Sequence, residues 1–136
     1  MAVRVLIADD DAAIRRLLRR LIESHAGWTV CGDADNGQDA VGKATQLSPD
    51  VIVLDLAMPQ MNGLQAAREI SRQVPQVPML LLTVQEVSKE LTNEAMHAGF
   101  KGAVSKSTGS EVVRAIEVLL QRQNFFEPVR GDAFAW

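Results

Sequence analysis

The stretch from Val51 to Gly63 constrains the fold more than any other part of this chain. It opens with four consecutive apolar residues, Val51 to Leu54, which is typical of a strand buried on both faces of a parallel sheet. Asp55 follows directly, so a carboxylate is expected at the carboxyl end of that strand. Pro59 and Gly63 then predict a loop before the next helix. In open α/β sheets, ligands bind at this edge.

Similar apolar runs alternate with amphipathic helix patterns along the chain. The predicted strands are residues 3–8, 29–33, 51–55, 79–83 and 102–105, and each is followed by apolar residues at helical spacing. Five strands alternating with five helices predict an α/β fold with a doubly wound parallel sheet. Five such units suit the flavodoxin-like strand order 2-1-3-4-5. On the first helix, four arginines are expected to face solvent: Arg15, Arg16, Arg19 and Arg20.

Composition narrows the class of protein. A chain of 136 residues with 47% apolar content is expected to form one domain with a real core. Its net charge of -3 argues against direct nucleic-acid binding and against binding to an anionic membrane. The single cysteine, Cys31, excludes an internal disulfide, and the first apolar run stops at Asp9, too short for a membrane span. We therefore expect a soluble, cytoplasmic protein.

Polar residues end most of the predicted strands. Asp9 and Asp10 follow the first, Asp55 ends the third, Thr83 ends the fourth, and Lys106 follows the fifth. If the first and third strands are neighbours, the three carboxylates lie close together and raise one another's pKa. A cation is then required among them. Lys106 is one candidate, and Mg²⁺ with several bound waters is the other.

These motifs, taken in order, resemble the receiver domains of two-component response regulators. The resemblance rests on Ala8-Asp9-Asp10, on Asp55-x-x-Met58-Pro59 with Gly63, on Thr83, and on Lys106 at the end of Gly102-Ala-Val-Ser-Lys106. It extends from Val3 to about Gln123. We therefore expect a receiver domain over residues 1–123 and an aromatic C-terminal tail over residues 124–136.

The resemblance implies that Asp55 accepts a phosphoryl group from a histidine kinase or from a small donor such as acetyl phosphate. It also implies that Mg²⁺ is held by Asp10, Asp55 and the carbonyl of Ala57, with Asp9 acting mainly through a metal-bound water. Phosphoryl transfer depends on in-line positioning and on neutralisation of charge, which such a site can supply.

The resemblance assigns the switch to two further residues. Lys106 is expected to pair with Asp55 before transfer and with a phosphoryl oxygen afterwards, while Thr83 donates its hydroxyl to another oxygen and draws the following loop inward. Ala57 and Gln85 occupy the positions that tune loss of the phosphoryl group, with Gln85 expected to orient a water.

Several positions depart from the family pattern, among them Ser107, which stands where a proline often follows the lysine. An aromatic residue is common two or three positions before the lysine, where this chain has Ala103 and Val104. Val84 follows Thr83 where a smaller residue is common, so it is expected to crowd the path to Asp55.

The tail contains four of the six aromatic residues, and we expect it to fold back on the domain or to bind a partner. These aromatics are Phe125, Phe126, Phe134 and Trp136.

The resemblance predicts a response regulator receiver that works through protein contacts and is not a conventional enzyme. Its expected partners are a sensor histidine kinase or phosphotransfer protein and a downstream protein or output domain, with homodimerisation left open. One alternative is the receiver portion of a DNA-binding transcriptional regulator. Another is a haloacid-dehalogenase phosphatase, which requires a second aspartate where Ala57 stands. A third is a degenerate receiver that binds partners without phosphorylation.

Overall fold

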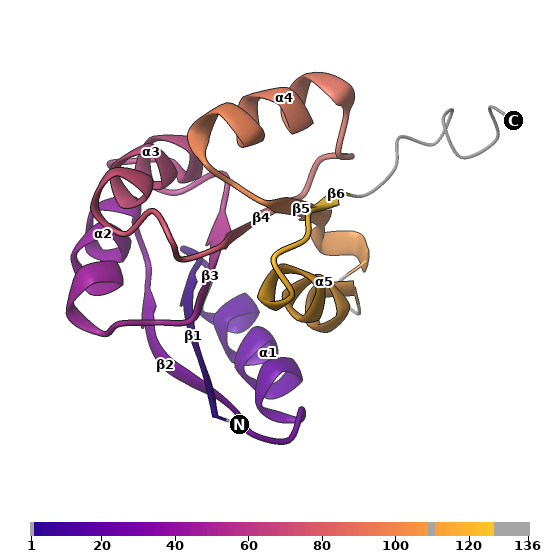
Figure 1. The fold of residues 1–136 in the computed structure, drawn as a ribbon. Helices are drawn as coiled ribbons and strands as arrows, with labels where there is room; N and C mark the ends of the chain where they lie inside the picture. The colour runs from indigo at the N-terminus through magenta and orange to yellow at the C-terminus, as the bar shows by residue number, and fades with distance from the viewer. Residues whose placement is uncertain (1, 109–110, 127–136) are drawn as a thin grey trace, which may run out of the picture.

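The computed structural model describes residues 2–108 and 111–126, and within these ranges six strands form one parallel sheet (Figure 1). The strand order is β2-β1-β3-β4-β5-β6. The strands are β1 (Val3–Ala8), β2 (Trp28–Ala34), β3 (Val51–Asp55), β4 (Met79–Thr83), β5 (Gly102–Ser105) and β6 (Phe125–Phe126). The α-helices are α1 (Ala12–Glu23), α2 (Gly37–Gln46), α3 (Gly63–Gln73), α4 (Lys89–Ala98) and α5 (Glu111–Leu120), and a short 3-10 helix spans Lys106–Thr108.

The sheet separates two apolar cores. Helices α2, α3 and α4 lie on one face and α1 and α5 on the other (Figure 1). Consecutive side chains of a strand point to opposite faces, so Leu54 belongs to the first core and Val53 to the second. All five residues of β3 are buried, which explains its unbroken apolar run.

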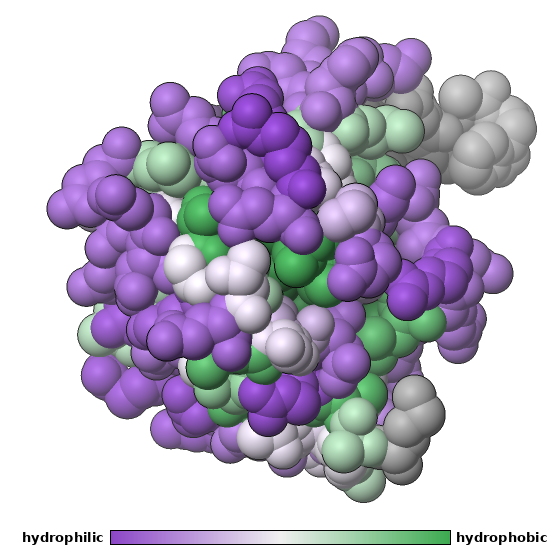
Figure 2. Space-filling view, turned by 60° about the vertical axis from the view of Figure 1, so that its left-hand side comes forward, coloured by the Kyte–Doolittle hydropathy of each residue, from purple (hydrophilic) through white to green (hydrophobic). Residues whose placement is uncertain are grey.

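The outer surface is mainly hydrophilic on the face shown in Figure 2, where hydrophobic residues emerge only in separate patches. Among the described residues, the large hydrophobic side chains with the greatest exposure are Leu17 (47%), Val84 (78%) and Met96 (49%). Within the same residues, no helix has the length and apolar character needed to cross a membrane.

The predicted α/β fold with a doubly wound parallel sheet is confirmed, including the order 2-1-3-4-5 for its first five strands. The structure adds β6, because Phe125 and Phe126 pair in parallel with Gly102 and Ala103. A two-residue strand has too few positions to show a periodic pattern, so the sequence did not predict it. The start of the tail therefore folds back on the domain. Phe134 and Trp136 lie outside the described residues, and the boundary between residues 1–123 and 124–136 stays a prediction.

Candidate functional site

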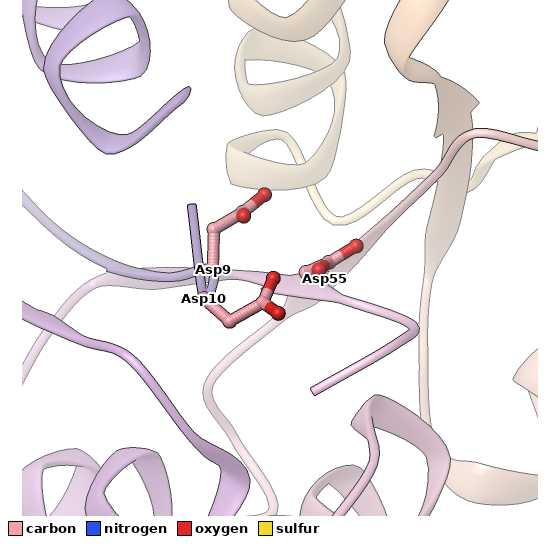
Figure 3. Close-up of side chains that lie close together, drawn as sticks. All are labelled: Asp9, Asp10 and Asp55. Atoms are coloured by element: carbon pink, nitrogen blue, oxygen red, sulfur yellow. The ribbon is translucent and has the colours of Figure 1, made fainter. Parts of the chain in front are cut away.

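Three carboxylates meet where β1 and β3 end. Ala8 pairs with Leu54 across these neighbouring strands, so the residues that follow them, Asp9 and Asp55, are adjacent. One carboxylate oxygen each from Asp9, Asp10 and Asp55 lies within 4.8 Å of the other two. Figure 3 shows the carboxylate of Asp10 turned towards that of Asp55. Asp9 and Asp55 are buried, whereas Asp10 is exposed, so the cluster opens to solvent on one side.

Lys106 supplies a positive charge to this cluster. Its Nζ lies 2.7 Å from Oδ2 of Asp9 and 3.1 Å from Oδ1 of Asp55. The other oxygen of Asp9, Oδ1, accepts the backbone N–H of Asp11 at 2.9 Å. The sequence predicted the pair with Asp55, and the structure adds the shorter contact with Asp9. One ammonium faces three carboxylates, so the site keeps a net negative charge that a further cation would neutralise.

The surroundings of Asp55 disfavour its ionised form. Burial of the carboxyl group, reinforced by the negative charge of Asp9, raises the pKa of Asp55 from 3.8 to about 6, although Lys106 opposes the shift. Burial lowers the pKa of Lys106, but its hydrogen bonds to Asp9 and Asp55 outweigh that effect and raise it overall. Asp55 is therefore a carboxylate that gains stability when it binds a proton, a cation or an electrophile at this site.

The loop after β3 is shaped by close backbone contacts. The N–H of Gly63 donates to the carbonyl of Leu56 at 2.8 Å, which turns the chain back towards β3. A Cβ atom at residue 63 would lie 2.3 Å from the carbonyl oxygen of Asp55, so only glycine fits there. Met58 is buried and anchors the loop in the first core, while Ala57 is exposed. The loop is thus held against the strand that ends in Asp55.

Thr83 and the residues after it lie beside the acidic cluster, at the same edge of the sheet. Thr83 ends β4 one residue beyond Leu82, which pairs with Asp55. Its side chain is buried, and its Oγ1 accepts the backbone N–H of Gln85 at 3.1 Å. A hydroxyl that accepts this bond keeps its proton for donation elsewhere. Val84 and Gln85 are exposed at the surface beyond Thr83.

The structure therefore brings Asp9, Asp10, Asp55 and Lys106 into one cluster and places Thr83 at the same edge. Ala57 and Gln85 lie on the two flanking loops, and their predicted roles are not tested by these contacts.

Arg15 is a supporting residue that the sequence did not identify. Its Nη1 donates to the carbonyl oxygen of Asp9 at 2.6 Å, and its Nε lies 3.7 Å from Oδ2 of Asp33 in β2. Arg16 and Arg20 are exposed as expected, and Arg19 is partly exposed while it pairs with Asp33, whereas Arg15 is half-buried, so the expectation is wrong for Arg15. These contacts depend on the conformations of long side chains, which neither the helical pattern of α1 nor the predicted strand order determines.

Comparison with known proteins identifies the family. The sequence model of the response regulator receiver domain matches residues 5–117, so the chain belongs to the response regulator receiver family. The chemotaxis protein CheY of Thermotoga maritima is 38% identical over 117 residues, a match that covers 85% of this chain and 96% of that protein. A LuxR-family two-component response regulator from Aurantimonas sp. SI85-9A1 superposes with a TM-score of 0.89 at 30% identity, and the match covers 94% of this chain and 91% of that one.

Other relatives are longer than this chain. The response regulator GacA of Pseudomonas viridiflava is 33% identical over 127 residues, a match that covers 93% of this chain but 59% of that protein. The transcriptional regulatory protein YdfI of Bacillus subtilis is 39% identical over 110 residues, covering 81% of this chain and 51% of that protein. The chain thus spans between about half and three fifths of the length of these two relatives.

Proposed function

We propose that this receiver accepts a phosphoryl group on Asp55 and thereby changes its contacts with a downstream protein or output domain. The donor is the phosphohistidine of a sensor histidine kinase or phosphotransfer protein, or a small phosphodonor such as acetyl phosphate. The observation that supports this proposal best is the cluster of Asp9, Asp10 and Asp55 within 4.8 Å, with Nζ of Lys106 3.1 Å from Asp55.

The residues present fit a bound Mg²⁺. The donors are carboxylate oxygens, which hard divalent cations prefer, and the exposed side of Asp10 leaves room for coordinated waters. Asp10, Asp55 and the carbonyl of Ala57 would hold the ion, while Asp9, already paired with Lys106, would act through a bound water. When bound, Mg²⁺ supplies positive charge that offsets the charge of the phosphoryl oxygens.

In the transfer step, a carboxylate oxygen of Asp55 attacks phosphorus in line with the bond that breaks. With a phosphohistidine donor that is the P–N bond, whose electron pair stays on the imidazole. The imidazole leaves as a neutral group when its other ring nitrogen is protonated. Lys106 then exchanges its contact with Asp55 for one with a phosphoryl oxygen.

Thr83 links the transfer to the switch. Its hydroxyl proton is free to donate, and turning towards the phosphoryl group breaks its present contact with the N–H of Gln85. The loop that follows Thr83 is then drawn towards Asp55, which shifts the population between two arrangements of this loop and α4. Loss of the phosphoryl group requires a water, for which Ala57 leaves space and which Gln85 orients.

The test is intact mass after incubation with acetyl phosphate and Mg²⁺. We expect one added phosphoryl group on the wild-type chain, and none on Asp55→Asn or when the metal is chelated. Because Val84 stands 78% exposed beside Thr83 and is expected to crowd the path to Asp55, the assay is repeated with a phosphorylated histidine kinase. Absence of an adduct with both donors would overturn the proposal and favour a receiver that binds partners without phosphorylation.

A second candidate is the receiver portion of a DNA-binding transcriptional regulator. It is favoured by the 51% coverage of the transcriptional regulatory protein YdfI and by the likeness to a LuxR-family regulator. The phosphatase alternative requires a carboxylate where Ala57 stands, and this site offers none there. Homodimerisation and a cytoplasmic location stay predictions.

A further inference from the structure

Four side chains form a row on the face of the sheet that α3 and α4 cover. Thr83 pairs with Ser105 between β4 and β5, and Ala103 pairs with Phe126 between β5 and β6. Thr83 is two residues beyond Leu81 and Ser105 two beyond Ala103, so all four side chains share one face. Leu81 and Ala103 belong to the first core, and Phe126 packs against that core. This row, named here the Thr83–Phe126 row, connects the candidate site to the last described strand.

The sizes of these side chains are uneven. Ser105 and Ala103, in the middle of the row, are small and buried, whereas Phe126 is large and half-buried at its end. The same core contains Val87 and Leu91, which follow Thr83 in the loop and in α4. Protein interiors are close-packed, so space vacated at Thr83 must be filled by a neighbour. Within the row, Phe126 is the side chain large enough to fill it.

Strand β5 is shaped to receive β6. A Cβ atom at residue 102 would lie 2.4 Å from the carbonyl oxygen of Phe125, so Gly102 permits the close approach of the two strands. The N–H of Phe125 donates to the carbonyl of Lys101 at 2.9 Å. The turn between α5 and β6 is fixed by Arg122, whose backbone has a φ of 64° and whose Nη1 donates to the carbonyl of Gln76 at 2.8 Å.

We propose that the Thr83–Phe126 row couples the side chain of Thr83 to the docking of β6. When the Thr83 hydroxyl turns towards Asp55, the Phe126 ring moves inward over Ala103, and β6 binds β5 more tightly. This inference rests on the proposed function for its trigger, because phosphorylation of Asp55 is what turns Thr83. Phosphorylation is then transmitted to the segment that follows residue 126 through a strand that belongs to the receiver itself.

The first test measures hydrogen exchange at the Phe125 amide, whose bond to Lys101 breaks when β6 opens. Phosphorylation by acetyl phosphate and Mg²⁺ is expected to slow this exchange by about fivefold or more, the lower end of typical coupling between sites. Asp55→Asn, treated in the same way, is expected to show no change. If intact mass shows the adduct and exchange is unchanged or faster, the inference is wrong while the proposed function stands.

The second test needs no phosphorylation. Thr83→Ala removes atoms from the row, so Phe126 is expected to move inward and the Phe125 amide to exchange more slowly than in wild type. The matched control is Thr29→Ala, because Thr29 is an exposed residue of β2 at the opposite edge of the sheet. Equal exchange at Phe125 in the two variants would overturn the inference. If no adduct forms with acetyl phosphate, the exchange measurement is repeated after phosphorylation by a histidine kinase. If neither donor gives an adduct, the proposed function fails, and the comparison of Thr83→Ala with Thr29→Ala alone tests the coupling between Thr83 and β6.

Discussion

Strands β3 and β6 belong to the same sheet but are held in it by different means. All five residues of β3 are buried between two neighbouring strands and two helical layers. The two residues of β6 are half-buried at an edge, and β6 pairs with β5 alone. Central strands therefore position the acidic cluster rigidly, whereas the edge strand can open without unfolding the sheet. Rigid placement at β3 suits a phosphoryl acceptor, and the weaker hold on β6 suits the coupling proposed above for that strand.

The largest expected effect is that of a substitution at the end of β3. Asp55→Asn is expected to abolish phosphorylation and also to raise the free energy of unfolding above pH 6. The reason is that burial and Asp9 raise the pKa of Asp55 to about 6. Because the folded chain holds this proton more tightly than the unfolded chain, wild-type stability falls as pH rises from about 4 to about 6.

The loss in the wild type is expected to be on the order of 1–2 kcal/mol, because water at the open side of the cluster screens part of the effect. Urea unfolding of both proteins at pH 4, 5, 6 and 7 measures it. The two stability curves should converge towards pH 4 and separate above pH 6. Parallel curves across this range would show that the ionised Asp55 is not destabilised by its surroundings.

Gly63→Ala tests the backbone contact that holds the site loop against β3. The added Cβ would lie 2.3 Å from the carbonyl oxygen of Asp55, so the loop must move. We expect a loss of about 2 kcal/mol or more in the free energy of unfolding, as for other severe steric conflicts. Gly42→Ala is the matched control, since a Cβ in that α2 position meets nothing within 4 Å. Alanine there should stabilise the helix by about 0.5–1 kcal/mol.

Gly102→Ala applies the same change at the adjustable edge. Its Cβ would lie 2.4 Å from the carbonyl oxygen of Phe125, a conflict nearly as close as the one at Gly63. Because β6 can detach, we expect a smaller cost of about 1 kcal/mol, together with rapid exchange of the Phe125 amide. Equal destabilisation by Gly63→Ala and Gly102→Ala would show that β6 at the edge is held as firmly as the loop after β3 at the centre.

The smallest expected effect concerns the lifetime of the phosphorylated state. Gln85→Ala removes the side chain proposed to orient the hydrolytic water, so loss of the phosphoryl group should become severalfold slower. The decay of phosphorylated protein, followed by intact mass after removal of the donor, measures this rate. The matched control is Gln38→Ala, because Gln38 is an exposed residue of α2. Gln65→Ala is unsuitable as a control because Gln65 caps α3. An unchanged rate in Gln85→Ala would end the proposed role.

Much of the centre of this fold could be predicted from sequence. The bounds of β3, β4 and β5 match the predicted strands because buried apolar runs have sharp polar ends. Parallel topology then forces the residues at those ends onto one edge, which explains why Asp9, Asp10, Asp55 and Lys106 were expected to meet.

The contacts that were missed depend on tertiary structure. The predicted strand order already places β2 beside β1, but the contact of Arg15 with Asp33 also depends on the conformation of the Arg15 side chain. Pairing of β6 depends on the close approach that Gly102 permits. The short contact between Lys106 and Asp9 depends on the direction of a flexible side chain, which strand order does not determine. Positions in the sheet were therefore predictable, whereas of these side-chain contacts only the pair of Lys106 with Asp55 was expected.

The proposed function requires that Asp55, and no other carboxylate of the cluster, carries the phosphoryl group. Reduction of the phosphorylated protein with borohydride converts an acyl phosphate into an alcohol, so the modified aspartate becomes homoserine and can be located by peptide mass spectrometry. We expect homoserine at residue 55 and unmodified aspartate at residues 9 and 10. Homoserine at residue 9 or 10, or phosphorylated protein without any homoserine, would contradict it.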